Sequence, residues 1–260
     1  MSKIQLTGFQ LKIIALIGMF IDHIYTHFGD LLGLPFWGSW IGRFVAPVFL
    51  FLLMEGFRYT SNRKAYFLRL LSGAGLMLVI NVLHNWLTSN YLDPLTREFD
   101  LWMLMNGNNI FLTLACFFLI FTLVEQIKEG KSGRWLKILY LLPLLFFTLL
   151  TEGGLYLMPL GLVLAFFPGS KRAANVVLLG TSLALALKAF LSYQGMSEFY
   201  PDLGSYLAYD NQFMQWLAIP LIAAYNGQRG GQGKVWEKNL FYIAYPLHLT
   251  LIYVIESLVR

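Results

Sequence analysis

Long runs of apolar residues recur along this chain, and they constrain its fold more than any other feature. A helix needs about 20 mostly apolar residues to cross the hydrocarbon core of a bilayer. Nine stretches of this kind occur, at residues 9–29, 40–59, 63–87, 108–126, 135–150, 154–167, 173–193, 212–225 and 238–258. The chain is also 57% hydrophobic and only 13% charged over its 260 residues. The sequence therefore predicts an all-α polytopic membrane protein with about nine transmembrane helices in one bundle.

No internal repeat, low-complexity tract or soluble domain separates these stretches, so residues 1–260 are interpreted as a single transmembrane domain. The first stretch is too long and too polar near its end for a signal peptide, and we expect a retained helix. The sixth stretch is short and contains Pro159, so a helix between two hinges explains it as well as a full crossing. Cys116 is the single cysteine, which excludes an internal disulfide.

Charged residues orient the predicted helices. Lysine and arginine gather around residues 58–69, 128–137, 171–172 and 229–238, whereas the intervening connections carry acids such as Asp93, Glu98 and Asp202. The positive-inside rule places the basic connections in the cytoplasm. We therefore expect a multi-pass protein of the cytoplasmic membrane with a cytoplasmic N-terminus. The net charge of +5 is explained by this topology and the surrounding membrane lipids, and no nucleic acid partner is expected.

Ionisable residues lie within the apolar stretches, where a charge costs roughly 2.5–3.5 kcal/mol at a helix centre. Asp22 and His23 are adjacent in the first stretch, and the rise of about 1.5 Å per residue places them in its outer half. A buried pair that fixes packing is the alternative to a functional site. The same counting predicts a polar belt toward the outer leaflet, with further members Arg43, His84, Asn85, Asn108, Asn109, Glu152 and Lys188. His248 falls near the middle of the last stretch.

A basic cluster is expected at the inner surface. Its members are Arg58, Arg63, Lys64 and Arg69. They suit anchors that orient the protein and contact anionic lipids, but they also suit a phosphate-rich ligand. Glu55 and Arg58 are three residues apart, so an ordinary helical ion pair competes with a functional site there.

Four segments carry a resemblance to a known family: LKIIALIGMFIDHIYTHFG, GRFVAPVFLFLLMEGFRYTSNRKAYFLRLL, NNIFLTLACFFLIF and KNLFYIAYPLHLTLIY. In this order they resemble the TraX family of integral membrane acetyltransferases, named for the conjugative-pilin acetylase. The last segment is also similar to the C-terminal helix of the broader acyltransferase-3 group. The resemblance implies transfer of an acetyl group from acetyl-CoA to an amine or hydroxyl acceptor at or across the membrane. The acceptor, a glycan or a peptide amine, is left open.

The resemblance also implies roles for individual residues. His23 matches the histidine that acts as base, flanked by Asp22, and Arg43 completes the expected catalytic group. The expected substrate-binding residues are Asn108, Asn109, Glu152 and His248. The expected contacts of acetyl-CoA, entering from the cytoplasm, are Glu55, Arg58, Arg63, Lys64 and Arg69. No metal is expected.

Acyl transfer from a thioester needs a base for the acceptor proton and a donor for the developing oxyanion. His23 with Arg43 or Asn109 offers both, and His248 is the alternative base. A proton-coupled transporter of a small polar solute is the rival function, with Asp22, His23, Glu55 and Lys188 on the ion path. The lack of an inverted repeat in the sequence disfavours it. A noncatalytic assembly or scaffold subunit is the third alternative.

Overall fold

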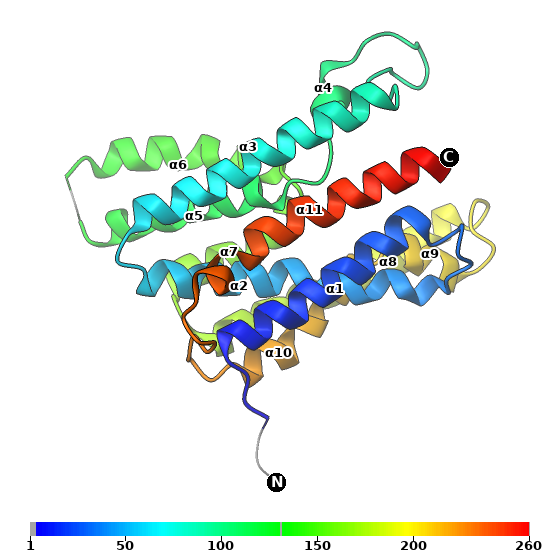
Figure 1. Cartoon of the computed structure of the whole chain (residues 1–260). Coiled ribbons are helices and arrows are strands. Elements are labelled where there is room, and N and C mark those ends of the chain that lie inside the picture. The colour runs from blue at the N-terminus through cyan, green and yellow to red at the C-terminus, as the bar shows by residue number, and fades with distance from the viewer. Residues whose placement is uncertain (1–3, 131, 260) are drawn as a thin grey trace. The chain divides into compact units, whose positions relative to one another are not determined.

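The computed structural model describes residues 4–130 and 132–259, whose regular structure is helical apart from two isolated β-bridges. Eleven α-helices and two 3₁₀ helices (η1 and η2) follow one another along this described part of the chain (Figure 1). Their bounds are α1 Gly8–Phe28, η1 Phe36–Phe44, α2 Val45–Tyr59, α3 Arg63–Leu87, α4 Leu101–Met105, α5 Ile110–Lys128, α6 Arg134–Leu149, α7 Gly154–Phe166, α8 Lys171–Met196, α9 Leu203–Tyr209, η2 Gln212–Leu217, α10 Ala218–Ala224 and α11 Val235–Val259. The prediction of an all-α fold is confirmed.

Among the described residues, six helical segments are long and apolar enough to cross a membrane. They are α1, η1 together with α2, α3, α5, α8 and α11. The multi-pass character is therefore confirmed. Each of the nine predicted stretches coincides with helix, but three of them form shorter elements. These are α6 with 16 residues, α7 with 13 residues, and η2 followed by α10. The number of nine crossings and the cytoplasmic N-terminus stay predictions.

The long helices expose apolar faces, as a bilayer requires. On α3 the side chains of Leu68, Leu71, Leu76, Val79 and Leu83 are all exposed, and their spacing of three to five residues places them along one side. Burying apolar surface gains about 25 cal/mol per Å², so an uncovered stripe of this length is unfavourable in water. Lipid chains are the natural cover for such a surface.

The helices form two compact units. The first unit combines Met1–Arg58 with Tyr156–Asn239, and the second combines Tyr59–Leu155 with Leu240–Arg260. Each unit is thus assembled from two pieces of chain that are far apart in the sequence. The single domain expected for residues 1–260 and its single bundle stay predictions, and each unit is described by itself.

Glycines allow η1 to lie directly against α1 in the first unit. A Cβ atom on Gly18 would lie 2.6 Å from the Phe44 ring, and one on Gly38 would lie 2.7 Å from the Tyr25 ring. At Gly42 it would lie 2.0 Å from Cγ of Asp22. These distances are too short for any side chain, so the approach of the two helices depends on glycine at these positions.

The change from η1 to α2 has a local cause. Pro47 has no N–H to donate to the carbonyl of Arg43 four residues earlier, and its ring crowds that carbonyl. The α-helical pattern is interrupted there, and the α-helix proper begins at Val45. Arg43 consequently lies in the last turn of the 3₁₀ helix, facing α1.

Helix α5 forms the centre of the second unit, where α3, α5 and α6 run side by side (Figure 1). Gly73 of α3 lets the Phe111 ring approach, because a Cβ there would lie 2.7 Å from it. The fully buried Phe111 ring also meets three aromatic rings of α11, those of Phe241, Tyr242 and Tyr245, at 5.0, 5.6 and 5.2 Å between centroids. This aromatic contact fixes α11 against the start of α5.

We expect Gly42→Ala to destabilise the protein, because the added Cβ would overlap the Asp22 carboxylate. Overpacking of this kind costs typically 1–3 kcal/mol. The change should lower the melting temperature of the detergent-purified protein. Gly180→Ala in α8 is the matched control, since a Cβ there meets nothing within 4 Å. A melting temperature for Gly42→Ala equal to that of the control would contradict the close approach of η1 and α1.

The number of crossings fixes the side on which the C-terminus lies. Nine crossings from a cytoplasmic N-terminus place it outside the cytoplasm, whereas the six long segments alone would place it inside. We expect a C-terminal alkaline phosphatase fusion to be active and a C-terminal green fluorescent protein fusion to be dark. The opposite pattern would show an even number of crossings. Fusions after Lys128, in a basic connection, provide the cytoplasmic reference.

Candidate functional site

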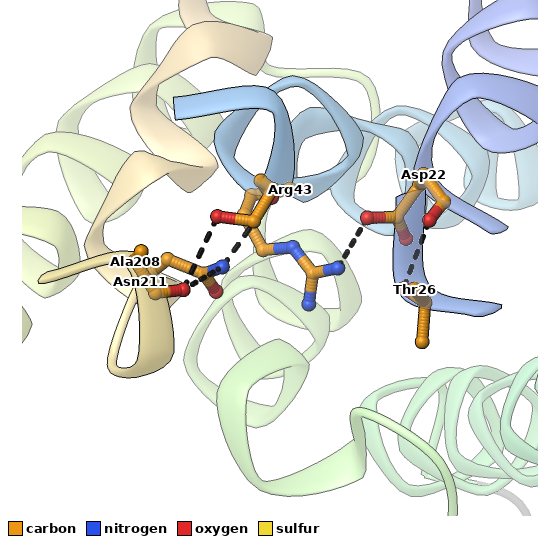
Figure 2. A network of polar contacts seen from close by, with 6 residues as sticks. Asp22, Thr26, Arg43, Ala208 and Asn211 are labelled. Carbon is orange, nitrogen blue, oxygen red and sulfur yellow. Dashed lines mark hydrogen bonds and ion pairs between the residues drawn. The ribbon is translucent and has the colours of Figure 1, made fainter. Parts of the chain in front are cut away.

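Asp22 and Arg43 form an ion pair in the first unit (Figure 2). Nη2 of Arg43 donates to Oδ1 of Asp22 over 2.5 Å, and the two side chains are only 22% and 16% exposed. Thr26, one turn later on α1, donates its hydroxyl hydrogen to the carbonyl oxygen of Asp22. Partial removal from water strengthens the attraction between opposite charges and also makes an unpaired charge costly. The structure thus brings together two of the three residues expected to be catalytic.

A second set of bonds positions η1, the element that carries Arg43. Ser39 Oγ donates to the carbonyl of Ala208 over 3.1 Å, and Trp40 Nε1 donates to the carbonyl of Leu207 over 3.2 Å. Asn211 Nδ2 donates to the carbonyls of Ser39 and Ala208 (Figure 2). The end of α9 and the residue that precedes η2 therefore hold η1, while α1 binds the Arg43 side chain.

The Arg43 guanidinium retains donor capacity. Arginine has five N–H donors, and Asp22 takes one of them. Its Nε atom is buried and has no hydrogen-bond partner among the described residues. A buried donor without a partner is costly, and an anionic or oxyanionic ligand oxygen is a suitable acceptor for it.

His23 is buried, with 7% of its surface exposed, so it does not lie on the lipid-facing surface of α1. Adjacent residues of a helix point about 100° apart, so His23 and Asp22 face different neighbours. Asn109 and His248, which were expected to line one cavity with them, belong to the second unit. The shared cavity stays a prediction.

The second unit holds a buried polar group at the start of α5. The Glu152 carboxylate, in the turn between α6 and α7, accepts from the backbone N–H of Asn109 and, over 3.2 Å, from the Tyr245 hydroxyl. That hydroxyl accepts in turn from the N–H of Ile110 over 3.3 Å. Thr113 Oγ1 donates to the carbonyl of Glu152. The carboxylate therefore compensates the partial positive charge at the N-terminus of α5 and ties it to α11.

Asn109 caps α5. Its Oδ1 accepts from the N–H of Leu112 over 3.2 Å, while its Nδ2 donates to the carbonyl of Ala74 over 3.0 Å. Both ends of the amide are occupied, and they join α5 to α3. The geometry gives Asn109 a structural task, and its expected contact with substrate stays a prediction.

Asn108 belongs to a closed triangle of hydrogen bonds. Its Nδ2 donates to the Tyr253 hydroxyl over 3.2 Å, which donates to Oδ1 of Asn81 over 3.3 Å. Asn81 Nδ2 donates back to the carbonyl of Asn108. The His84 ring stacks on Tyr253 with centroids 4.1 Å apart. Four side chains, two from α3, one from α11 and one from the residue before the α5 cap, thus share one polar patch.

His248 of α11 has a defined tautomer when neutral. Its Nδ1 lies 2.7 Å from the carbonyl oxygen of Ala244, which can only accept, so Nδ1 carries the hydrogen. The neutral ring then has its lone pair on Nε2, as a general base needs. Pro246 leaves the carbonyl of Tyr242 without its helical donor, but His248 uses the carbonyl of Ala244 instead.

The expected coenzyme cluster is divided between the units. Arg58 donates to Glu55 over 2.8 Å in the first unit. In the second unit Arg63 forms two hydrogen bonds with Glu125, one of 3.0 Å, and Lys64 is exposed. Arg69 lies over the Tyr66 ring at 5.6 Å. Two of the four cations are thus already paired with carboxylates.

Several polar partners were missed by the sequence analysis. Lys188 pairs with Asp210 over 2.6 Å, an acid that was not among the expected site residues. Tyr245 and Tyr253 lie eight residues apart, which places them on one face of α11, and this spacing was a usable signal. Glu125 gave no such signal, since its partner is 62 residues earlier in the chain.

Two acids of the connections serve local structure. Asp93 accepts from the N–H groups of Thr96 and Leu95, which lowers the pKa of its carboxyl group. Asp202 accepts from the N–H and the hydroxyl of Ser205 at the start of α9, and its pKa is lowered for the same reason. These bonds shape a turn and a helix cap, and they are not features of a binding site. Asn85 is similar, since its Nδ2 donates to the carbonyls of Met103 and Asn106 around the end of α4.

Comparisons with known proteins bear on the whole chain. A family model described as TraX protein matches residues 7–256. A probable fimbrial assembly protein FimC, serogroup H1, from Dichelobacter nodosus is 27% identical over 260 residues, which cover 96% of each chain. No solved structure matches.

These findings correct the expected function. The sequence led us to expect a transferase that moves acetyl from acetyl-CoA to an unspecified acceptor, or else a proton-coupled transporter. This expectation is wrong, because the family and the fimbrial relative point to pilus assembly or pilin acetylation. The resemblance to the TraX family is confirmed. The similarity of the last helix to the acyltransferase-3 group stays a prediction.

We expect Glu152→Gln and Tyr245→Phe to destabilise the protein in a coupled manner. Each change removes a partner from a buried group, at a cost of about 1–3 kcal/mol. Because both act on the same bonds, the double variant should lose less than the sum, with a coupling energy of about 0.5–3 kcal/mol. Denaturant unfolding in detergent measures this. Tyr140→Phe, at an exposed tyrosine of α6, is the control, and strictly additive losses would contradict the shared network.

Proposed function

This chain belongs to the TraX family, and we propose that it acts in pilus assembly, on the pilin subunit at the cytoplasmic membrane. The observation that carries the proposal is the alignment with a probable fimbrial assembly protein over 96% of both chains. An alignment of this extent includes every helix that positions the polar groups described above. The shared function therefore belongs to the membrane-embedded helices.

We further propose that the chemistry is acetylation of the pilin subunit. The first unit supports it, since a buried histidine adjoins a carboxylate that is paired with a partly unbonded arginine. In this proposal His23 takes the proton of the attacking pilin amine or hydroxyl, and Asp22 holds the Arg43 guanidinium in place. Arg43 donates to the oxygen of the tetrahedral intermediate. The leaving group of the donor then departs with the proton.

The acetyl donor expected from the sequence is acetyl-CoA, and it stays a prediction. His248 is the alternative base, since its neutral tautomer carries the lone pair on Nε2. A noncatalytic assembly protein is the rival within pilus biogenesis. It would need the same helices but no chemistry from His23.

The test is co-production of the chain with its pilin in a host that lacks both. Intact-mass spectrometry of the pilin should show the gain of one acetyl group with the wild-type chain. His23→Ala should lower the acetylated fraction by about 100-fold or more, because general base catalysis contributes typically 100- to 10,000-fold. Asp22→Asn should retain part of the activity, since an amide oxygen can still accept from Arg43 but no longer offsets its charge.

His248→Ala tests the alternative base, and in this proposal it should lower acetylation much less than His23→Ala does. If His248→Ala abolishes acetylation and His23→Ala does not, the two histidines exchange roles. Counting surface pili by electron microscopy in the same strains separates chemistry from assembly. Pili that depend on the chain, formed from a pilin of unchanged mass, would reject acetylation and favour the noncatalytic assembly protein.

A further inference from the structure

A glycine-rich segment, 226–234, connects α10 to α11 in the first unit and is bound to the start of α1. The N–H groups of Gly8 and Phe9 donate to the carbonyls of Gln228 and Arg229, each over 2.8 Å. The N–H of Asn226 donates to the carbonyl of Leu6 over 2.9 Å. Three backbone hydrogen bonds thus give this segment a fixed position beside the first turn of α1.

Two glycines of the segment adopt a left-handed backbone conformation and also lie too close to neighbouring side chains to carry a Cβ atom. Gly230 has φ +66°, and a Cβ there would lie 2.3 Å from Oγ1 of Thr7. Gly231 has φ +71°, and a Cβ there would lie 2.6 Å from the Glu237 carboxylate. Both positions combine a left-handed backbone with close approach. The segment is therefore ordered by its contacts and is not an unstructured linker.

One anion of the protein already occupies part of this segment. The buried Glu237 carboxylate accepts from the N–H groups of Gln232 and Gly233, over 2.7 and 2.8 Å. Lys171 is occupied as well, because its Nζ donates to the carbonyl of Tyr225 over 2.6 Å. These bonds account for two backbone donors of the segment and for one nearby cation, but not for the side chain of Arg229.

Arg229 and Lys12 are two cations with exposed side chains. Within residues 4–130 and 132–259, neither side chain forms an ion pair with a carboxylate. The N–H of Phe9, three residues before Lys12, donates to the carbonyl of Arg229, so the fold keeps two like charges near each other, where they repel. A bound anion relieves such repulsion, and phosphate oxygens are suited to paired arginine and lysine donors.

The position of Lys12 on α1 relates this pair to the proposed catalytic group. Lys12 and His23 are 11 residues apart, so they lie about 20° apart around the helix and about 16 Å apart along it. A ligand bound at Lys12 by an anionic end would therefore need a long arm to reach His23. Coenzyme A joins its phosphates to its sulfur through such an arm, whereas inorganic phosphate does not.

We propose that Lys12 and Arg229 form a binding site for a phosphate-bearing ligand at the cytoplasmic end of α1. The site differs from the expected cluster of Arg58, Arg63, Lys64 and Arg69. Two sources share the chemistry, namely the nucleotide end of coenzyme A and an anionic lipid headgroup. Only the assignment to an acyl donor rests on the proposed function, and phosphate binding itself does not.

The experiment measures binding by the full chain in nanodiscs, in a buffer without phosphate. The probe for the first source is coenzyme A with discs of neutral phosphatidylcholine. The probe for the second is phosphatidylglycerol, counted by native mass spectrometry after exchange from mixed discs. The test variant is Lys12→Gln with Arg229→Gln. The matched control, Lys234→Gln with Lys238→Gln, removes two cations from the same connection and the start of α11.

We expect the test variant to weaken coenzyme A binding about ten-fold or more, since two charge-assisted hydrogen bonds are lost, while the control stays within about two-fold. The exchange variant, Lys12→Arg with Arg229→Lys, keeps both charges and should bind coenzyme A as the wild type does. If the wild-type chain and the control retain phosphatidylglycerol that the test variant loses, while none of them binds coenzyme A, this result supports the site with a lipid as its ligand. Equal losses in test and control, or no loss in either, would overturn the proposal.

Two further measurements distinguish a misfolded variant from the loss of a binding site, and failure of the site from failure of the proposed function. Equal melting temperatures and an unchanged C-terminal reporter show that the variants fold and insert normally. His23→Ala should bind coenzyme A as the wild type does, because the phosphate contacts are remote from it. If the wild-type chain binds coenzyme A but does not acetylate pilin, the proposed function is rejected and the site is retained.

Discussion

The ion pair between Asp22 and Arg43 is the interaction on which the first unit depends. An unpaired charge is costly within an apolar span, so each of the two charged groups stabilises the other. Their meeting requires that a 3₁₀ helix lie against α1 with no side chain between them, which glycine at position 42 provides. The bonds from Ser39 and Asn211 then fix η1 from the side of α9. The ion pair thus depends on a glycine at position 42 and on the hydrogen bonds that hold η1 in place.

The second unit also stabilises a charged group in an apolar environment, but it does so without a cation. The Glu152 carboxylate is stabilised by the N–H of Asn109, by the Tyr245 hydroxyl and by the N-terminal end of α5. Both units therefore place ionised groups inside an apolar environment, but one neutralises charge with charge and the other with oriented dipoles. The first solution leaves donors of Arg43 available, whereas the second occupies nearly every polar atom that it uses. This contrast favours the first unit for chemistry and the second for support of α11.

The helices were predictable because length and hydropathy are local properties. The stretch at 63–87 was predicted with the bounds of α3, and the others differ from their helices by a few residues. The pairing of Asp22 with Arg43 was predictable because few cations occur at that depth. The partner of Lys188 was missed, since Asp210 lies in a connection whose position depends on the packing of α8 and α9. Glu125 was missed because its partner is distant in sequence, and periodicity carries no information about such contacts.

The composition of the units has a consequence for biosynthesis. The backbone N–H groups of Gly8 and Phe9, among the first made, receive their acceptors from residues 228 and 229, which leave the ribosome more than 200 residues later. The whole of 59–155, which belongs to the other unit, is synthesised in between. Until residues 228 and 229 have been made, the N–H groups of Gly8 and Phe9 lack these acceptors, although Asp22 is already part of α1. The order of translation thus makes the early pairing of Asp22 with Arg43, only 21 residues away, the contact that can protect the first helix while the rest of its unit is still being made.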